Sequence, residues 1–133
     1  MKFLCDTNIF LQILRDRQFA RQCADFLKAN MHQSFIGSFG VFSLCIRAHY
    51  FQMEQAATQL MFDLIQGGLK IIPIDPTQTF TILMASKGEG LTFDDFLHHK
   101  LAKENGLTLV TLDNDFLKIK DKLDIHICQP QDV

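Results

Sequence analysis

The sequence has no tryptophan, one tyrosine and three prolines among its 133 residues, and no apolar run in it is long enough to cross a membrane. A membrane-spanning helix needs about 20 consecutive apolar residues, so such a helix is excluded and no membrane partner is expected. An excess of one charge is also missing, because 13 Lys and Arg stand against 15 Asp and Glu. Such a balance gives no general attraction to nucleic acid, so any contact with it must come from a local patch.

The four cysteines are scattered, and none belongs to a Cys-x-x-Cys pair. Because zinc needs clustered thiolate or imidazole ligands, we expect no zinc site and interpret the cysteines as buried, reduced thiols. Apolar residues, by contrast, make up 47% of the chain and include 13 Phe, enough for the core of a single domain over residues 1–133. Asp6 comes too early for a signal peptide, so we expect a cytoplasmic protein.

Short apolar segments alternate with stretches of helical periodicity along the whole chain. The apolar segments predict strands at residues 2–5, 34–36, 69–74, 107–112 and 125–128. The stretches between them predict helices at residues 9–15, 18–30, 39–51, 52–66, 77–86 and 92–105. Pro73 indicates an edge position or the end of the third strand. Since no Asn-Gly hairpin signal occurs, the pattern favours an α/β fold with a parallel sheet covered by helices on both faces.

Aspartates gather where strands of such a sheet end. Asp6 follows the first strand and Asp113 and Asp115 follow the fourth, while Asp94 and Asp95 open the helix that leads into the fourth strand. Ligands of open parallel sheets bind outside the carboxyl ends of the strands. Carboxylates that converge in a cleft repel one another unless a cation lies among them. Oxygen ligands without Cys or His suit Mg²⁺ or Mn²⁺, so the sequence predicts a divalent-metal site.

Each acid also has a purely structural interpretation. Thr92 and Asp95 have the spacing of a helix capping box, and Asp113 and Asp115 fit the turn that follows a strand. Asp6 is harder to explain in this way, because an acid directly after a buried strand has no local partner. The joint placement of the acids therefore predicts the site, and no single residue does.

Two stretches of the chain resemble motifs of the PIN-domain family. Residues 6–11, Asp-Thr-Asn-Ile-Phe-Leu, are similar to the opening motif of the family. Residues 91–116 are similar to a later stretch of the family pattern. That stretch has a helix with an acid followed by an Ala, then a glycine-containing turn, and it ends in T-x-D-x-D-F. The resemblance implies a PIN-like three-layer α/β/α fold and a VapC-like toxin ribonuclease of a type II toxin–antitoxin system. It also implies an RNA substrate, an antitoxin protein as a partner, and a homodimer.

The resemblance also implies roles for single residues. The acids that would hold Mg²⁺ or Mn²⁺ and act in catalysis are Asp6, Asp95 and Asp113. Around them the family pattern matches an auxiliary metal-binding acid at Asp115 and the orienting polar residues Asn8 and Thr111. Asp94 takes the place of Asp95 if the alignment is shifted by one residue. We expect the three main carboxylates to gather around one ion.

One position departs from the family pattern. The family has a Glu early in the helix after the second strand, and this sequence has Ser43 there, with no acid between Asp25 and Glu54. Arg47 lies four residues later on the same helical face, so it is a candidate for a phosphate contact or for a charge that replaces part of the metal ion. Because a site for a hard cation depends on its number of charged oxygens, the lost carboxylate weakens metal binding.

Two functions from different classes therefore stay open. The first is a metal-dependent ribonuclease, in which a water activated by carboxylate-held Mg²⁺ or Mn²⁺ attacks an RNA phosphodiester. The second is a degenerate PIN domain, with Ser43 in place of the Glu, which binds RNA or a protein partner without cleavage. A phosphatase or receiver domain also has an Asp after its first strand, but Asn8 stands where the phosphatase motif has a second Asp.

Histidines and arginines near these motifs have weaker signals. Side chains of the adjacent His98 and His99 point about 100° apart on a helix, so we interpret one as exposed and the other as packed. Arg15, Arg17 and Arg21 follow the first predicted helix. They are candidates either for phosphate contacts or for a solvated basic face.

Overall fold

The computed structural model describes residues 1–88, 90–119 and 123–133 of the chain. Its five strands form one sheet in the order β3-β2-β1-β4-β5, and every neighbouring pair is parallel. The strands are β1 (Phe3–Cys5), β2 (Ser34–Gly37), β3 (Lys70–Ile72), β4 (Thr108–Val110) and β5 (Ile127–Cys128). The parallel sheet of five short strands that the sequence predicts is therefore confirmed.

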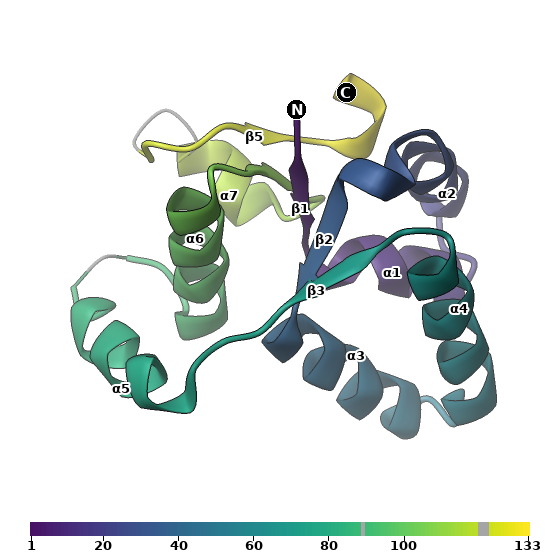
Figure 1. Cartoon of the computed structure of the whole chain (residues 1–133), viewed down its shortest axis with the longest axis horizontal. Coiled ribbons are helices and arrows are strands. Elements are labelled where there is room, and N and C mark those ends of the chain that lie inside the picture. Colours follow the sequence, from purple (N-terminus) through teal and green to yellow (C-terminus); the bar gives the residue numbers. More distant parts are fainter. Residues whose placement is uncertain (89, 120–122) are drawn as a thin grey trace.

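Helices cover both faces of this sheet. They are α1 (Thr7–Leu14), α2 (Ala20–Asn30), α3 (Ser38–Tyr50), α4 (Glu54–Gln66), α5 (Pro76–Ala85), α6 (Phe93–Asn105) and α7 (Asn114–Ile119). Short 3₁₀ turns η1 (Met31–Gln33) and η3 (Pro130–Asp132) complete the described elements. Figure 1 shows α1 to α4 on one side of the strands and α5, α6 and α7 on the other, which is a three-layer α/β/α arrangement.

Neighbouring residues of the central strands point into different layers. Phe3 and Cys5 of β1 belong to the core cluster that includes side chains of α1, α2 and α4, whereas Leu4 packs with side chains of α6 and α7. In β4, Val110 belongs to the first cluster and Leu109 to the second. Alternate residues of a strand face opposite sides of a sheet, so burial on both faces explains why these strands are apolar throughout.

Most predicted elements are present, with ends that differ by a few residues. β3 lies at the edge of the sheet, as Pro73 indicates, and Gly106 ends α6 with a φ of 63°, a left-handed conformation that glycine adopts readily. The segment after β4 differs, because α7 begins at Asn114 where the sequence predicts only a turn. Asp113 starts this helix: its Oδ1 accepts a hydrogen bond from the backbone N–H of Asp115 at 2.9 Å.

Two further expectations concern the cysteines and the membrane. Cys5 and Cys23 are buried, and burial raises the pKa of both thiols, that of Cys23 to about 11. Cys45 is exposed, so the interpretation of the cysteines as buried is wrong at that position. In the described part of the chain, every helix is too short or too polar to span a bilayer.

The order of the strands fixes where a ligand can approach. From β1 the chain moves outward through β2 to β3, then crosses to the other side of β1 to form β4 and β5. In open parallel sheets a crevice forms at this change of direction, outside the carboxyl ends of the strands. Asp6 follows β1 and Asp113 lies shortly after β4, so both residues lie at this crevice.

Candidate active site

A cleft of about 150 Å³ opens at the carboxyl ends of β1 and β4. Its walls come from the start of α1, from α3, from the first turns of α6 and from the segment after β4. The acidic side chains that line it are Asp6, Asp94, Asp95 and Asp113. The structure therefore brings together, in one cleft, acids that are far apart in the sequence.

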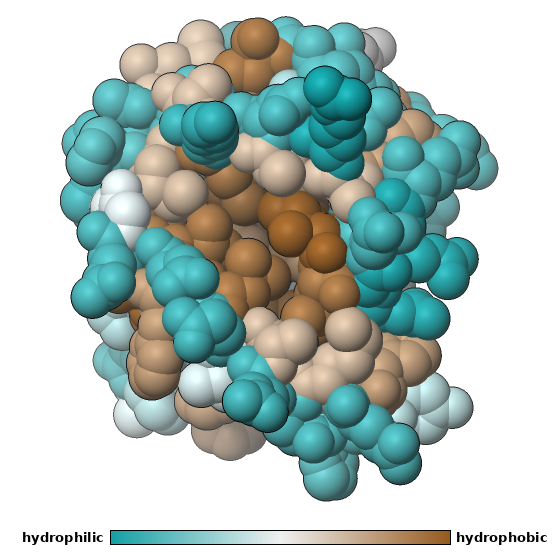
Figure 2. Space-filling view, turned by 90° about the vertical axis from the view of Figure 1, so that its right-hand side faces the viewer, coloured by the Kyte–Doolittle hydropathy of each residue, from teal (hydrophilic) through white to brown (hydrophobic). Residues whose placement is uncertain are grey.

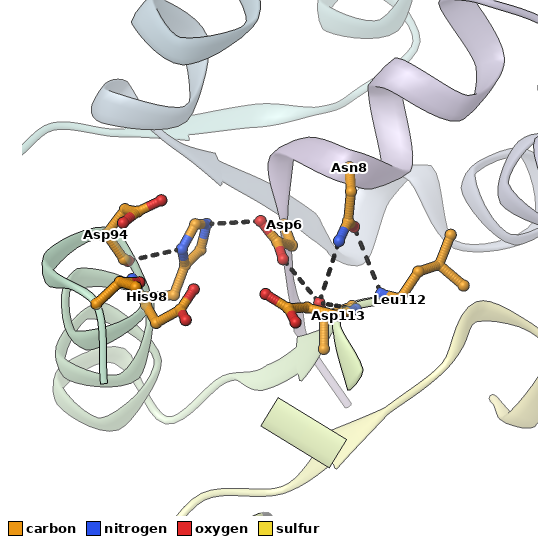
Figure 3. A network of polar contacts seen from close by, with 9 residues as sticks. Asp6, Asn8, Asp94, His98, Leu112 and Asp113 are labelled. Carbon is orange, nitrogen blue, oxygen red and sulfur yellow. Dashed lines mark hydrogen bonds and ion pairs between the residues drawn. The ribbon is translucent and has the colours of Figure 1, made fainter. Parts of the chain in front are cut away.

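Asp6 is held in place through both of its carboxylate oxygens. It occupies the N-cap position of α1, but its side chain makes no capping hydrogen bond to that helix. Its Oδ2 instead accepts a hydrogen bond from Thr111 Oγ1 at 2.7 Å, and its Oδ1 lies 3.4 Å from His98 Nε2 (Figure 3). Asp6 is 8% exposed, so this carboxylate is buried and fixed in position by contacts from outside its own helix.

Thr111 connects the two strand ends that form the cleft. Its buried hydroxyl donates to Asp6 and accepts from the backbone N–H of Asp113 at 2.9 Å and from Asn8 Nδ2 at 3.5 Å. Asn8 Oδ1 in turn accepts from the backbone N–H of Leu112 at 3.4 Å (Figure 3). Thr111 and Asn8 thus orient the acids by tying the start of α1 to the segment after β4.

His98 is a site residue that the sequence analysis treated only as packing. It is buried on α6, where its Nδ1 lies 3.0 Å from the carbonyl oxygen of Asp94 and its ring packs edge to face with Phe39 at 4.5 Å. A carbonyl oxygen only accepts, so Nδ1 carries a hydrogen and donates it. Nε2 faces the Asp6 carboxylate, and that contact is an ion pair when the ring carries its second hydrogen. The sequence could have indicated this role, because His98 lies three residues after Asp95 and this spacing puts both side chains on one face of the helix.

Asp95 combines a capping position with a place in the cleft. Thr92 caps α6 by accepting a hydrogen bond from the backbone N–H of Asp95 at 3.4 Å, as the capping-box spacing predicts. The Asp95 carboxylate is nevertheless buried, and its pKa is raised to about 6. Burial is the largest cause, and repulsion from Asp113, Asp94 and Asp6 adds to it. The neighbouring Asp94 is exposed, so Asp95 is the one of the two whose carboxylate is buried in the fold.

The remaining predicted residues divide between the cleft and its surroundings. Asp113 is half-buried in the cleft wall, whereas Asp115 is exposed and does not line the cleft. Ser43 and Arg47 of α3 both face the cleft, as their spacing on one helical face predicts. Within the described ranges no carboxylate lies at ion-pair distance from Arg47. His98, and not Arg47, is therefore the basic side chain that contacts an acid of the site.

The donor atoms of the cleft fit a hard cation, but their spacing limits how it can be held. Among residues 1–88, 90–119 and 123–133, no three His, Cys, Asp or Glu side chains lie close enough together to hold a metal ion, so the described acids do not form the expected shell of three carboxylates. Burial is the largest cause of the raised pKa of Asp95, and a cation would relieve the repulsion from neighbouring carboxylates that adds to it. Mg²⁺ is commonly bound by one or two carboxylates together with water and substrate phosphate, and the cleft can supply that number.

Comparisons with known proteins identify the fold and the family of the chain. No curated protein matches the chain. Among solved structures, a toxin–antitoxin complex from Klebsiella pneumoniae is 22% identical, with a TM-score of 0.70 over 97% of this chain and 98% of that chain. VapBC2 from Rickettsia felis, bound to a DNA fragment from its promoter, is 19% identical, with a TM-score of 0.69 over 97% and 98%. FitAcB from Neisseria gonorrhoeae is 19% identical, with a TM-score of 0.68 over 98% and 99%.

At these identities the solved structures establish a shared fold. The sequence itself matches a family model, that of the PIN domain, over residues 3–122. This range includes the strand ends, the cleft and both motifs from which the resemblance was inferred. The chain belongs to the PIN domain family.

Proposed function

We propose that the chain is a metal-dependent ribonuclease, a VapC-like toxin that hydrolyses phosphodiester bonds of RNA. The observation that supports this most is that several aspartates lie together, wholly or partly buried, in the cleft at the carboxyl ends of β1 and β4. Asp6 and Asp95 are buried there, Asp113 is half-buried, and the pKa of Asp95 is raised to about 6. Strongly perturbed carboxylates in a cleft are typical of functional sites, because burying mutually repelling charges lowers stability.

In the proposed reaction each group has a separate task. Two of the carboxylates of Asp6, Asp95 and Asp113 would hold Mg²⁺ or Mn²⁺, and the ion would supply an activated water and stabilise charge on the phosphoryl group. Thr111 fixes the Asp6 carboxylate through its 2.7 Å hydrogen bond. Arg47, exposed at the cleft wall, donates hydrogen bonds to an RNA phosphate, which the planar guanidinium can do through two N–H groups.

The α3 side of the cleft favours a second candidate, a PIN domain that binds RNA or a protein without cleavage. Ser43 stands where a further acid would strengthen metal binding. His98 lies 3.4 Å from Asp6, and a ring with both hydrogens supplies positive charge to the acids without a metal ion. A cleft neutralised in this way has less need of a cation and no activated water.

A cleavage assay separates the two candidates. The chain and its Asp6→Asn variant are incubated with end-labelled RNA in millimolar Mg²⁺ or Mn²⁺, with parallel samples in EDTA. The ribonuclease proposal expects products from the unmodified chain in metal, and none in EDTA or with Asp6→Asn. Intact RNA in every sample, with binding retained, establishes the non-cleaving candidate instead. Equal cleavage by both proteins indicates a contaminating nuclease and removes support for the proposal.

We also propose an antitoxin protein as a partner. The solved complex from Klebsiella pneumoniae contains a toxin and an antitoxin, and exposed apolar patches often mark sites of protein–protein interaction. Figure 2 shows an apolar hollow on the face that carries α2 and α4. Leu14 of α1 and Leu60 of α4 remain partly uncovered beside the first core cluster. Co-expression with a candidate antitoxin and co-purification of the two chains tests this partner.

A homodimer is the second proposed assembly, and α3 supplies the supporting surface. Phe42, Ile46 and Tyr50 are 69%, 70% and 79% exposed, and their spacing of four residues puts them in one stripe along the helix. Contiguous exposed apolar side chains mark interaction surfaces. Light scattering of the chain and of Ile46→Glu is expected to give the mass of a dimer and of a monomer, respectively. A monomeric unmodified chain contradicts the proposed dimer.

A further inference from the structure

A second hollow, of about 200 Å³, adjoins the acidic cleft and has the opposite charge. The two hollows share Asn8, Leu11 and Arg47 as lining residues. The rest of the second hollow is lined by Gln12, Arg15, Arg17 and Phe51. Three of its seven lining residues are therefore arginines, and none is acidic.

Two tight turns border this hollow. α1 ends at Leu14, and Asp16 follows with a φ of 49°, so the chain reverses between Arg15 and Arg17. On the opposite wall α3 ends at Tyr50, and Gln52 has a φ of 56° directly after Phe51. Asp16 and Gln52 are the non-glycine residues with positive φ in the described ranges. Such left-handed conformations are uncommon outside glycine and often occur at functional sites.

Arg15 is fixed on an aromatic ring within this hollow. Its guanidinium carbon lies 3.6 Å from the centre of the Phe51 ring, and both side chains are half-buried. Stacking on an aromatic face fixes the plane of a guanidinium while leaving its N–H groups free at the edge. The hollow therefore presents hydrogen-bond donors in a defined direction.

In the part of the chain that the structure describes, the three guanidiniums have no carboxylate partner and no side-chain hydrogen bond. Arg15 lies at the C-terminal end of α1 and Arg47 in the last turn of α3. The negative ends of the two helix dipoles offset the repulsion between these cations. The arrangement thus holds positive charges together and leaves their donors for an external anion.

We propose that this basic hollow, formed by Arg15, Arg17 and Arg47 around Phe51, binds backbone phosphates of single-stranded RNA beside the acidic cleft. The inference rests on the proposed function, because it takes RNA as the substrate of that cleft. One arginine guanidinium can donate two parallel hydrogen bonds to two oxygens of the same phosphate. The shared wall at Arg47 favours RNA over an acidic peptide, since a strand held by the arginines is delivered to the carboxylates that the proposed reaction uses.

Binding without metal tests this subsite independently of cleavage. The anisotropy of a fluorescent single-stranded oligoribonucleotide is measured in EDTA with the unmodified chain and with Arg15→Gln, Arg17→Gln and Arg47→Gln. Each substitution is expected to weaken binding about tenfold and to lower the slope of log K against log salt by about 0.7, the value for one lost phosphate contact with a single strand. Arg21→Gln makes the same charge change on α2, outside the hollow, and is expected to alter binding less than twofold.

Three results overturn the subsite. Binding that is unchanged in the first three variants shows that the hollow does not contact RNA, and equal weakening in Arg21→Gln shows that only total charge matters. Displacement of the labelled RNA by polyglutamate as efficiently as by unlabelled RNA assigns the hollow to an acidic protein instead. Equal melting temperatures of the variants exclude unfolding as the cause.

The outcome is separable from that of the proposed function. Asp6→Asn is expected to abolish cleavage without weakening RNA binding in EDTA, because it leaves the arginines in place and removes a negative charge from the adjoining cleft. RNA binding that depends on the arginines, in a chain that never cleaves, removes the ribonuclease and keeps the subsite. If the unmodified chain cleaves RNA but the arginine substitutions leave RNA binding unchanged, the ribonuclease proposal is kept and the subsite is removed.

Discussion

Replacement of Asp95 by asparagine is expected to stabilise the folded protein at neutral pH. The Asp95 side chain is buried, and its pKa is raised from 3.8 to about 6 by burial and by nearby carboxylates, against a lowering effect of the Thr92 hydrogen bond. In the unfolded chain the same group has an ordinary pKa, so ionising it costs more in the folded state. A shift of about two pKa units corresponds to about 3 kcal/mol of unfolding free energy.

The pH range of the effect follows from the direction of the shift. Because folding raises the pKa of Asp95, the folded state binds the proton more tightly than the unfolded state between about pH 4 and pH 6. The free energy of unfolding therefore falls as pH rises through this range. The amide of the Asp95→Asn variant carries no charge, so the variant lacks this fall. The unfolding free energy of the variant is expected to equal that of the unmodified chain below about pH 4 and to exceed it by about 3 kcal/mol above about pH 6.

Urea unfolding followed by circular dichroism, in EDTA at about pH 4 and about pH 7.5, measures this difference. Asp94→Asn is the matched control, because Asp94 is the adjacent acid in the same cleft but is exposed. A constant difference between Asp95→Asn and the unmodified chain at the two pH values refutes the reasoning. So does an equal gain in Asp94→Asn, since the effect would then come from net charge and not from confinement. Under the proposed function the stabilised Asp95→Asn variant is also expected to lose metal-dependent cleavage.

Three further substitutions test the roles of single groups in the cleft. Ser43→Glu adds a carboxylate to the wall, so Mn²⁺ is expected to raise the melting temperature of this variant several degrees more than that of the unmodified chain; an equal rise contradicts the position assigned to Ser43. His98→Leu frees Oδ1 of Asp6 from its basic neighbour, and the Mn²⁺-dependent rise is again expected to be larger, as thermal denaturation will show. Thr111→Val leaves buried partners without their hydrogen bonds and is expected to lower the unfolding free energy by about 1–3 kcal/mol, whereas Thr111→Ser, which keeps the hydroxyl, should cost less.

The sheet was predictable because its strands are short, apolar and separated by helices. Pro73 indicated an edge position or the end of the third strand, and β3 lies at the edge; the helix predicted at residues 92–105 ends at Gly106. α7 was missed because Asp113 and Asp115 lie at its start, and aspartate is as typical of a turn as of the beginning of a helix. The hydrogen bond between Asp113 Oδ1 and the Asp115 backbone fits either structure, so local sequence does not distinguish them.

Asp6 and Asp113 were predictable from their positions near strand ends, and Thr111 from the family pattern, but the contact with His98 was not. Asp6 follows β1 directly and Asp113 lies shortly after β4, so the parallel topology alone places them at one edge of the sheet. The contact of His98 with Asp6 joins residues on different elements, and it depends on how α6 lies against β1. The basic hollow likewise depends on two left-handed turns, at Asp16 and Gln52, which neither residue type specifies.

If the cleft and the hollow act as proposed, metal and RNA are expected to strengthen each other's binding. The described acids form no group of three ligands for an ion, and α3 adds Ser43 and Arg47 where a further carboxylate would help. Mg²⁺ commonly completes a shell of few carboxylates with phosphate oxygens of the substrate, and a strand held by the arginines would bring those oxygens to the cleft. Since coupling between two ligands is reciprocal, RNA is expected to tighten Mn²⁺ binding by the same factor as Mn²⁺ tightens RNA binding. Equal affinities for Mn²⁺ with and without a non-cleavable oligonucleotide contradict a shared site, because the ion would then gain nothing from the phosphates.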